Sequence, residues 1–210
     1  MDADVGVIEG VVEIEGGVGL RNYGTSQQAE IEATGLAPAN AKESAILATV
    51  PPGAHTALVR GTNQSTGTAV IEGYDLETFS PTVLANISTR GFVGTSNDVL
   101  IGGFILGATT GTPQIVIRGL GPTLAAAGIT GALDDPLITI ANQNGSTLAS
   151  NDDWQDDAAG AAMIAAAGLA PNANPESAVI LQLPPASYTA ILSGKNGATG
   201  VGLIEIYNLR

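Results

Sequence analysis

Cysteine is absent from the 210 residues, which excludes disulfide bridges, thiolate metal sites and cysteine nucleophiles. Basic residues are scarce, since 7 Lys and Arg stand against 20 Asp and Glu, for a formal net charge of −13. Such an acidic chain is not expected to bind nucleic acid or anionic membrane surfaces. No apolar run approaches the roughly 20 residues that a membrane helix needs, so no membrane insertion is expected. Apolar residues still make up 44% of the chain, enough for a folded core.

A catalytic constellation is also missing from the sequence. The only histidine is His55, and its counterpart in the internal repeat described below is Tyr188, so a serine triad built on His55 is not expected. The stretch "RGLGPTLAAAG" has spaced glycines ahead of a short helix, but it lacks the Lys-Ser/Thr pair of a phosphate loop. We therefore expect a protein that is not an enzyme and has no cofactor.

An internal repeat dominates the chain. Residues 35–77 align with residues 168–210 without a gap, so that "ESAILATVPPGAHTA" returns as "ESAVILQLPPASYTA" and "IEGYDL" as "IEIYNL". A match of this length indicates duplication of one structural unit.

Each copy has the same predicted order of elements. The stretches "TSQQAEIEATG" and "DDAAGAAMIAAAG" predict short helices, capped by Ser26 in one copy and by Asp156 or Asp157 in the other. Each helix ends at a glycine, Gly35 or Gly168, suited to a left-handed position. Three β-like runs follow each helix, namely "SAILATV", "AHTALVRG" and "TAVIEGY" in the first copy and "SAVILQL", "SYTAILSG" and "VGLIEIY" in the second.

Only the second copy has a front half. Its further β-like runs are "TVLANIST", "RGFVG", "DVLIGGFILG", "QIVIRGL", "LITIANQ" and "STLAS", and "GPTLAAAG" predicts a short helix with Pro122 at its first position. The first twenty residues correspond at best to the "LITIANQNGSTLAS" region. We expect an all-β fold with two tandem β-sandwich (jelly-roll-like) units, each with a short helix. Residues 1–78 form the truncated unit and residues 79–210 the complete one.

Two of these runs, "DVLIGGFILG" and "QIVIRGL", are apolar on both faces. A sandwich strand normally alternates, so these strands are expected to be central or covered on their outer face by a neighbour. Glu72 and its counterpart Glu205 lie within the last run of each copy, and the sequence offers no partner that both copies share.

The order of "NDDW", a helix, "GLAP", "ESAVILQLPP", "SYTAILSG" and "GVGLIEIYNL" resembles a repeated β-sandwich module of secreted bacterial proteins. It is also loosely similar to the bacterial pre-peptidase C-terminal domains. In the first copy Tyr23 takes the place of Trp154 and the acidic run is lost. The resemblance implies an accessory module located outside the cell or at its surface.

One acidic cluster stands out in "NDDWQDD". Its four carboxylates belong to Asp152, Asp153, Asp156 and Asp157. Calcium takes six to eight oxygen ligands, so these residues are a candidate calcium site, although the spacing is not that of an EF-hand. Helix capping and surface charge account for the same residues equally well.

These patterns favour a non-enzymatic extracellular structural module. We expect it to assemble head-to-tail with copies of itself into a filament or surface layer, with strand exchange between subunits as one route. The alternative is a carbohydrate-binding or adhesion module appended to a secreted enzyme, which would need exposed aromatic residues.

Overall fold

A computed structural model describes residues 10–14, 18–20, 27–40, 42–76, 85–107 and 112–209. The chain divides into two compact units, Met1–Val83 and Leu84–Arg210, which we call unit 1 and unit 2. Each unit is described by itself. The boundary expected between residues 78 and 79 falls in the 77–84 segment, outside the described residues. No described helix is long and apolar enough to cross a membrane.

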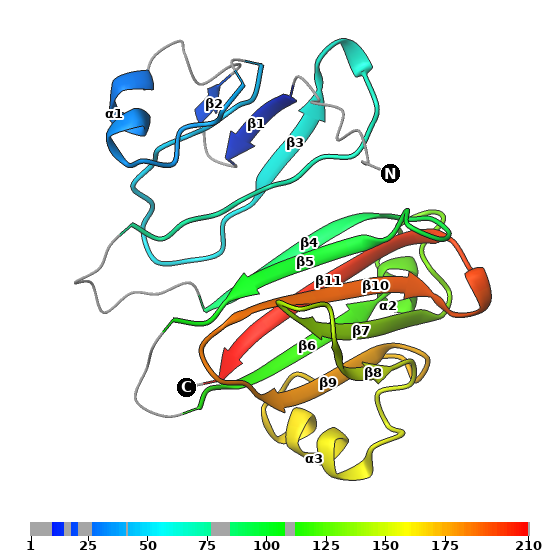
Figure 1. The fold of residues 1–210 in the computed structure, drawn as a ribbon. Helices are drawn as coiled ribbons and strands as arrows, with labels where there is room; N and C mark the ends of the chain where they lie inside the picture. Colours follow the sequence, from blue (N-terminus) through cyan, green and yellow to red (C-terminus); the bar gives the residue numbers. More distant parts are fainter. Residues whose placement is uncertain are drawn as a thin grey trace. The chain divides into compact units, whose positions relative to one another are not determined.

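Unit 2 contains eight strands in two antiparallel four-stranded sheets, which confirms the expected all-β class (Figure 1). One sheet has the order β4-β11-β6-β9 and the other β5-β10-β7-β8. The strands span Asn86–Val93, Leu100–Ile105, Gln114–Leu120, Pro136–Asn142, Thr147–Asn151, Ser177–Gln182, Ser187–Gly194 and Gly200–Leu209, for β4 to β11 in turn. The first strand pairs with the last along its whole length, as in a jelly roll.

The core of unit 2 lies between its two sheets. Alternate residues of each strand point inward, because successive side chains of a strand face opposite sides. The buried cluster joins both sheets and includes Val93, Phe104, Ile117, Ile138, Leu192 and Ile204. Phe104 stacks on Tyr188 with 5.4 Å between ring centroids. The two sheets of unit 2 thus enclose one continuous hydrophobic core.

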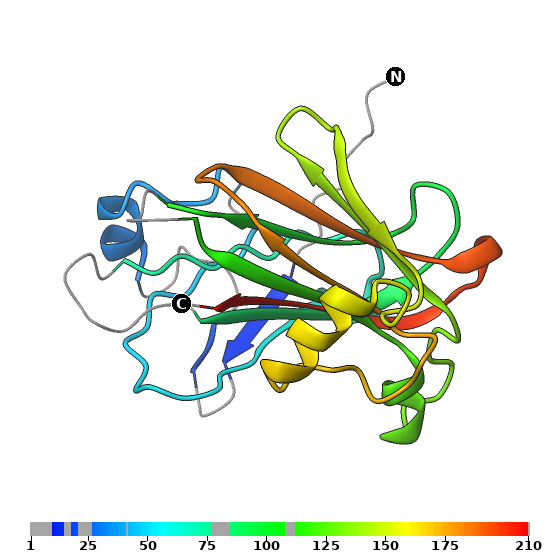
Figure 2. The same cartoon turned by 90° about the horizontal axis from the view of Figure 1, so that it is seen from below.

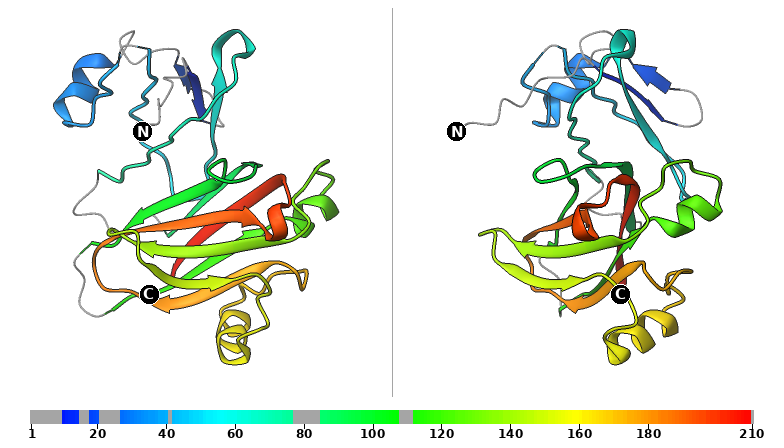
Figure 3. Two further views of the ribbon diagram at one scale, coloured as in Figure 1. Left: turned by 45° about the vertical axis from the view of Figure 1, so that its right-hand side comes forward. Right: turned by 90° about the vertical axis from the view of Figure 1, so that its right-hand side faces the viewer.

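Two helices complete unit 2. The α2 helix (Pro122–Ala126) has Pro122 at its start and is followed by Gly128 at φ +88°, as the sequence predicted. The α3 helix (Ala158–Ala166) lies outside the sheet beside β9 (Figures 2 and 3). Its Ile164 packs with Val116 of β6 in a second buried cluster. The outer face of β6 is therefore covered from within the chain, which explains why "QIVIRGL" is apolar on both faces.

The strand β5 behaves differently from β6. It lies at the edge of its sheet, and its outward side chains Ile101 and Ile105 are exposed. The run "QIVIRGL" (β6) thus has the covered outer face that was expected. In the run "DVLIGGFILG" (β5), no described residue covers the outer face.

Unit 1 has one three-stranded antiparallel sheet in its described part, with the order β2-β1-β3. These strands are Gly10–Ile14 (β1), Val18–Leu20 (β2) and Ala57–Gly61 (β3), and the helix α1 spans Gln28–Ala33. The candidate cap Ser26 lies outside the described residues. Gln27 holds the N-cap position without a side-chain capping bond, and its amide instead bonds the backbone of Leu47.

Some backbone details recur at matching positions of the two units. A 3-10 turn follows β3 at Thr62–Gln64 (η2), and another follows β10 at Lys195–Gly197 (η3). Both turns contain an asparagine in the left-handed region, Asn63 at φ 53° and Asn196 at φ 55°.

The strand registers agree with the repeat as well. In unit 1, β3 pairs β1 and β1 pairs β2, as β10 pairs β7 and β7 pairs β8 in unit 2. Residues 10–14 and 18–20 therefore supply counterparts of β7 and β8, within the region that the sequence suggested.

Two of the three strands predicted after α1 are wrong. The predicted runs "SAILATV" (44–50) and "TAVIEGY" (68–74) align with β9 and β11, yet the described residues place neither run in a strand (Figure 1). In unit 2, β9 pairs β6, and β11 pairs β4 and β6. The part of unit 1 that the structure describes contains no counterpart of β4, β5 or β6, so no described strand pairs with these two segments.

Candidate functional site

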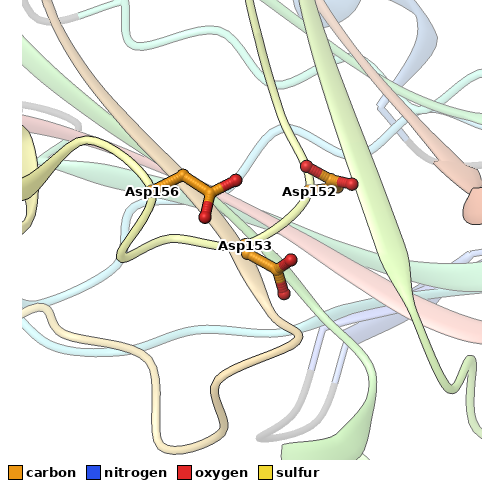
Figure 4. Close-up of side chains that lie close together, drawn as sticks. All are labelled: Asp152, Asp153 and Asp156. Atoms are coloured by element: carbon orange, nitrogen blue, oxygen red, sulfur yellow. The ribbon is translucent and has the colours of Figure 1, made fainter.

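Three of the four candidate calcium ligands come together after β8. Asp152, Asp153 and Asp156 each place a carboxylate oxygen within 4.8 Å of the others (Figure 4). The strand end and the following turn position them, since they come one after another along the loop that joins β8 to α3.

A lysine already lies among these carboxylates. The Nζ of Lys195 is 2.7 Å from Asp152, 3.7 Å from Asp153 and 3.9 Å from Asp135. The hydrogen bond to Asp152 raises the pKa of Lys195, and the same bond lowers the pKa of Asp152. Because its ammonium charge repels a second cation, the cluster fits Ca²⁺ poorly.

Asp157 does not join the other three. Its side chain accepts a hydrogen bond of 3.1 Å from the backbone N–H of Ala159, so it is the N-cap of α3. The sequence proposed this capping role for Asp156 or Asp157, and the structure assigns it to Asp157.

A cavity of about 170 Å³ opens between β8, β9 and α3. Trp154, Asn151 and Asp157 contribute to its wall together with apolar residues such as Ile164 and Ile180. The indole N–H of Trp154 is buried and has no hydrogen-bond partner among the described residues. This is the one place where the tryptophan considered for carbohydrate binding borders a hollow in the described surface.

Glu176 is a fully buried carboxylate at the start of β9. Its relative exposure is 0%, and its two oxygens accept four hydrogen bonds. The donors are the backbone N–H groups of Gly121, Thr123 and Ala173 and the hydroxyl of Thr123, at 2.7 to 3.3 Å. Glu176 thereby ties the start of α2 to the loop before β9, and burial of the charge is compensated by these donors.

Arg118 of β6 is the second polar centre of unit 2. It lies opposite Glu205 of β11 in the strand register and donates two hydrogen bonds to that carboxylate. The guanidinium also donates to the hydroxyl of Tyr207 at 3.1 Å and to the carbonyl of Leu169 at 3.0 Å. Tyr207 donates in turn to Glu205, and burial beside that carboxylate raises the pKa of the Tyr207 phenol.

Unit 1 contains counterparts of the acidic residues of both polar centres. Glu72 and Tyr74 are the counterparts of Glu205 and Tyr207, and the Tyr74 hydroxyl lies 3.3 Å from a Glu72 oxygen. The nearby Glu72 charge raises the pKa of Tyr74. Glu43, the counterpart of Glu176, accepts from the Asn40 N–H at 3.2 Å. The described residues of unit 1 contain no counterpart of Arg118 or of the Gly121–Thr123 turn.

The apolar residues of the repeat are also exposed in unit 1. Val50 has a relative exposure of 46%, whereas its counterpart Leu183 has 5%. Ile71 has 51%, whereas its counterpart Ile204 has 1%. We call the surface formed by residues 44–50 and 65–76, with Glu43 beside it, the open face of unit 1.

His55 lies on the exposed side of unit 1. Its Nε2 is 2.8 Å from the carbonyl oxygen of Pro51, a backbone contact rather than a contact with a nucleophile. The sequence-based rejection of a histidine-based triad stays a prediction.

Sequence reasoning missed Arg118 and Glu176 as the two polar centres. Glu205 could be singled out from the sequence, because a glutamate recurs at the same position of an apolar strand in both copies. Its partner Arg118 could not, because it lies 87 residues away. Glu176 also recurs in both copies as the residue before a β-like run. Acidic residues that recur in both copies therefore point to Glu176 and to Glu205, whereas no local signal points to Arg118.

Comparison with known proteins adds no family to these observations. No family model matches the chain, and no curated protein matches it either.

Proposed function

We propose that this protein is a non-enzymatic extracellular structural module. Through the open face of unit 1 it joins neighbouring modules of the same kind into a filament or surface layer. The observation that carries this proposal is the contrast between the two units. Side chains that are buried in unit 2 are half exposed at the same positions of unit 1.

The open face has a free-energy consequence. Burying a Val, Leu or Ile side chain stabilises a protein by roughly 1.5–3 kcal/mol. Val50, Val70 and Ile71 are each at least 46% exposed, so covering them together would release roughly 3 kcal/mol or more. Exposed apolar surface next to segments that pair with no described strand favours β-augmentation by another polypeptide.

The composition supports a role outside the cell. Lys42 and Lys195 are the only lysines, and Gly, Thr and Asn are abundant, so the surface offers proteases that cleave after lysine few sites. A long-lived structural layer benefits from that resistance.

Carbohydrate binding is the second candidate function. The cavity beside Trp154 favours it, because sugar sites combine an aromatic surface with a few polar groups. Binding of a sugar at this cavity would quench or shift the fluorescence of Trp154, the only tryptophan of the chain.

Immunogold electron microscopy tests the leading proposal. Antibodies raised against unit 2 are applied to intact cells that produce the protein, and gold is expected along filaments or over a continuous outer layer. Labelling confined to the cell interior would overturn the structural role. A glycan array with the purified chain, read by Trp154 fluorescence, tests the alternative.

A further inference from the structure

Exposed apolar side chains of unit 2 gather at one edge of its sandwich. This edge is formed by β4 and β5, the edge strands of the two sheets, which contact each other. Ile101 and Ile105 of β5 are 55% and 76% exposed, and Phe92 of β4 is 62% exposed. These are the three most exposed large apolar side chains in the described part of unit 2. An edge strand with such side chains pairs readily with another chain.

The strand β5 carries none of the features that normally block pairing at an edge. Its register with β10 is regular over all six residue pairs, and residues 99–107 include neither a charged residue nor a proline. The paired residues on the same outer face of β10 and β7 are uncharged as well, namely Ser187, Thr189, Ile191, Leu137, Thr139 and Ala141. In a chain of net charge −13, this uncharged face allows a second copy to approach with little repulsion.

The backbone of β5 directs hydrogen-bonding groups to the same edge. The N–H of Leu106 donates to the carbonyl of Ala186 at 3.0 Å, so the backbone groups of Leu106 point toward β10. In an antiparallel sheet, alternate residues direct their N–H and C=O groups to opposite sides. The groups of Ile101, Gly103 and Ile105 therefore lie at the open edge, where no described strand pairs with them. They can pair with one further antiparallel strand.

The sequence of this strand is nearly the same in both directions. Residues 100–106 read LIGGFIL, with Leu at each end, Ile next to it and Gly103 at the centre. When two such strands pair antiparallel about a two-fold axis at Gly103, Ile101 of each copy faces Ile105 of the other. Leu100 faces Leu106 in the same way. A two-fold contact requires a self-complementary surface, so a second copy of this chain fits this edge.

We infer that the open edge of β5 is a homodimer interface, in which two copies pair their β5 strands antiparallel about a two-fold axis at Gly103. The four-stranded sheets of the two copies then join into one continuous sheet. The two pairs of Ile101 with Ile105 cover both ends of the new ladder on its outer face. A two-fold contact closes on itself and gives a dimer, so this interface goes beyond the proposed filament contact through the open face of unit 1.

A single cysteine tests the position of the axis, because the full chain has no cysteine of its own. Gly103→Cys places a thiol of each copy beside the axis. Hydrogen-bonded antiparallel partners have Cα atoms about 5.5 Å apart, which a disulfide can bridge. Nothing lies within 4 Å of a Cβ built at Gly103, so the variant is expected to fold. Under mild oxidation it is expected to form a covalent dimer on a non-reducing gel.

Two further cysteine variants test the register. The two copies of residue 101 lie roughly 14 Å apart in the proposed dimer, and so do the two copies of residue 105. Ile101→Cys alone and Ile105→Cys alone are therefore expected to remain uncross-linked. A mixture of these two variants is expected to cross-link, because residue 101 of one copy faces residue 105 of the other. Cross-linking of Ile101→Cys alone as fast as Gly103→Cys would show random collision and overturn the inference.

Sedimentation equilibrium of the full chain without cysteine measures the dimer directly. Ile105→Lys is expected to raise the dissociation constant of the dimer by about a hundredfold, about tenfold for each of the two isoleucines that the interface loses. Thr147→Lys adds the same charge to β8, at the opposite edge of the sheet, and is expected to leave the constant unchanged.

A chain that stays monomeric at high concentration and does not cross-link at residue 103 would overturn the inference. A dimer that Ile105→Lys and Thr147→Lys weaken equally would overturn it too. Gold-labelled filaments on cells, together with either of these results, would refute only this inference. Cross-linking at residue 103 without extracellular labelling would refute only the proposed function.

Discussion

The buried carboxylate of Glu176 allows a sharp test of what holds unit 2 together. Glu176→Ala removes the acceptor for four donors on Gly121, Thr123 and Ala173. A buried donor left without a partner costs roughly 1–3 kcal/mol, so the substitution is expected to destabilise unit 2 by about 4 kcal/mol or more. That is a large share of the roughly 5–15 kcal/mol that stabilises a typical domain.

Urea denaturation followed by tryptophan fluorescence measures this loss. Trp154 is the only tryptophan and lies in unit 2, so the signal reports that unit. With a slope of about 2 kcal/mol per molar urea, the midpoint is expected to fall by about 2 M. Glu43→Ala is the matched control, since Glu43 accepts one bond from Asn40, and it is expected to leave the midpoint unchanged. Equal midpoints for the two variants would refute the role assigned to Glu176.

Three further predictions concern the acidic cluster and α3. Neither Ca²⁺ nor EDTA is expected to change the melting temperature, because the Lys195 ammonium already lies among the carboxylates and repels a second cation; a calcium-dependent rise that Asp152→Ala abolishes would contradict this. The Lys195–Asp152 contact stabilises the folded state only while both groups are charged. The stability difference between the protein and Lys195→Met is therefore expected to vanish as pH falls below the ordinary Asp value of 3.8 and as it rises above the ordinary Lys value of 10.5, measured as melting temperature against pH. Ile164→Ala, at 1% exposure, is expected to cost roughly 2–5 kcal/mol, whereas Met163→Ala, at 45%, is expected to cost under about 1 kcal/mol in the same urea assay.

Local signals in the sequence predicted local structure well. Pro122 and Gly128 bracketed α2, and Gly168 marked the end of α3 at φ +72°. The runs "QIVIRGL" and "SYTAILSG" coincide with β6 and β10. Each of these features depends on backbone preferences of neighbouring residues, which a single stretch of sequence contains.

Local signals did not predict which strands pair with one another when they are remote in sequence. "SAILATV" reads as a strand as well as "SAVILQL" does, yet only the second has β6 beside it. A strand is stabilised by its ladder, so its formation depends on segments remote in sequence. The same limit hid the partner of Glu205 and made Asp157 look like a ligand, although it caps α3.

The pairing of β4 with β11 has a consequence for biosynthesis. The two strands are the first and last of unit 2, and every residue of β4 faces one of β11. A ribosome must therefore release nearly all of unit 2 before its larger sheet can close. Contacts this remote in sequence slow folding, so β5 and β6 stay uncovered for as long as synthesis lasts. Unit 1, whose sheet joins β1, β2 and β3, emerges first and can form its strand pairs while unit 2 is still being made.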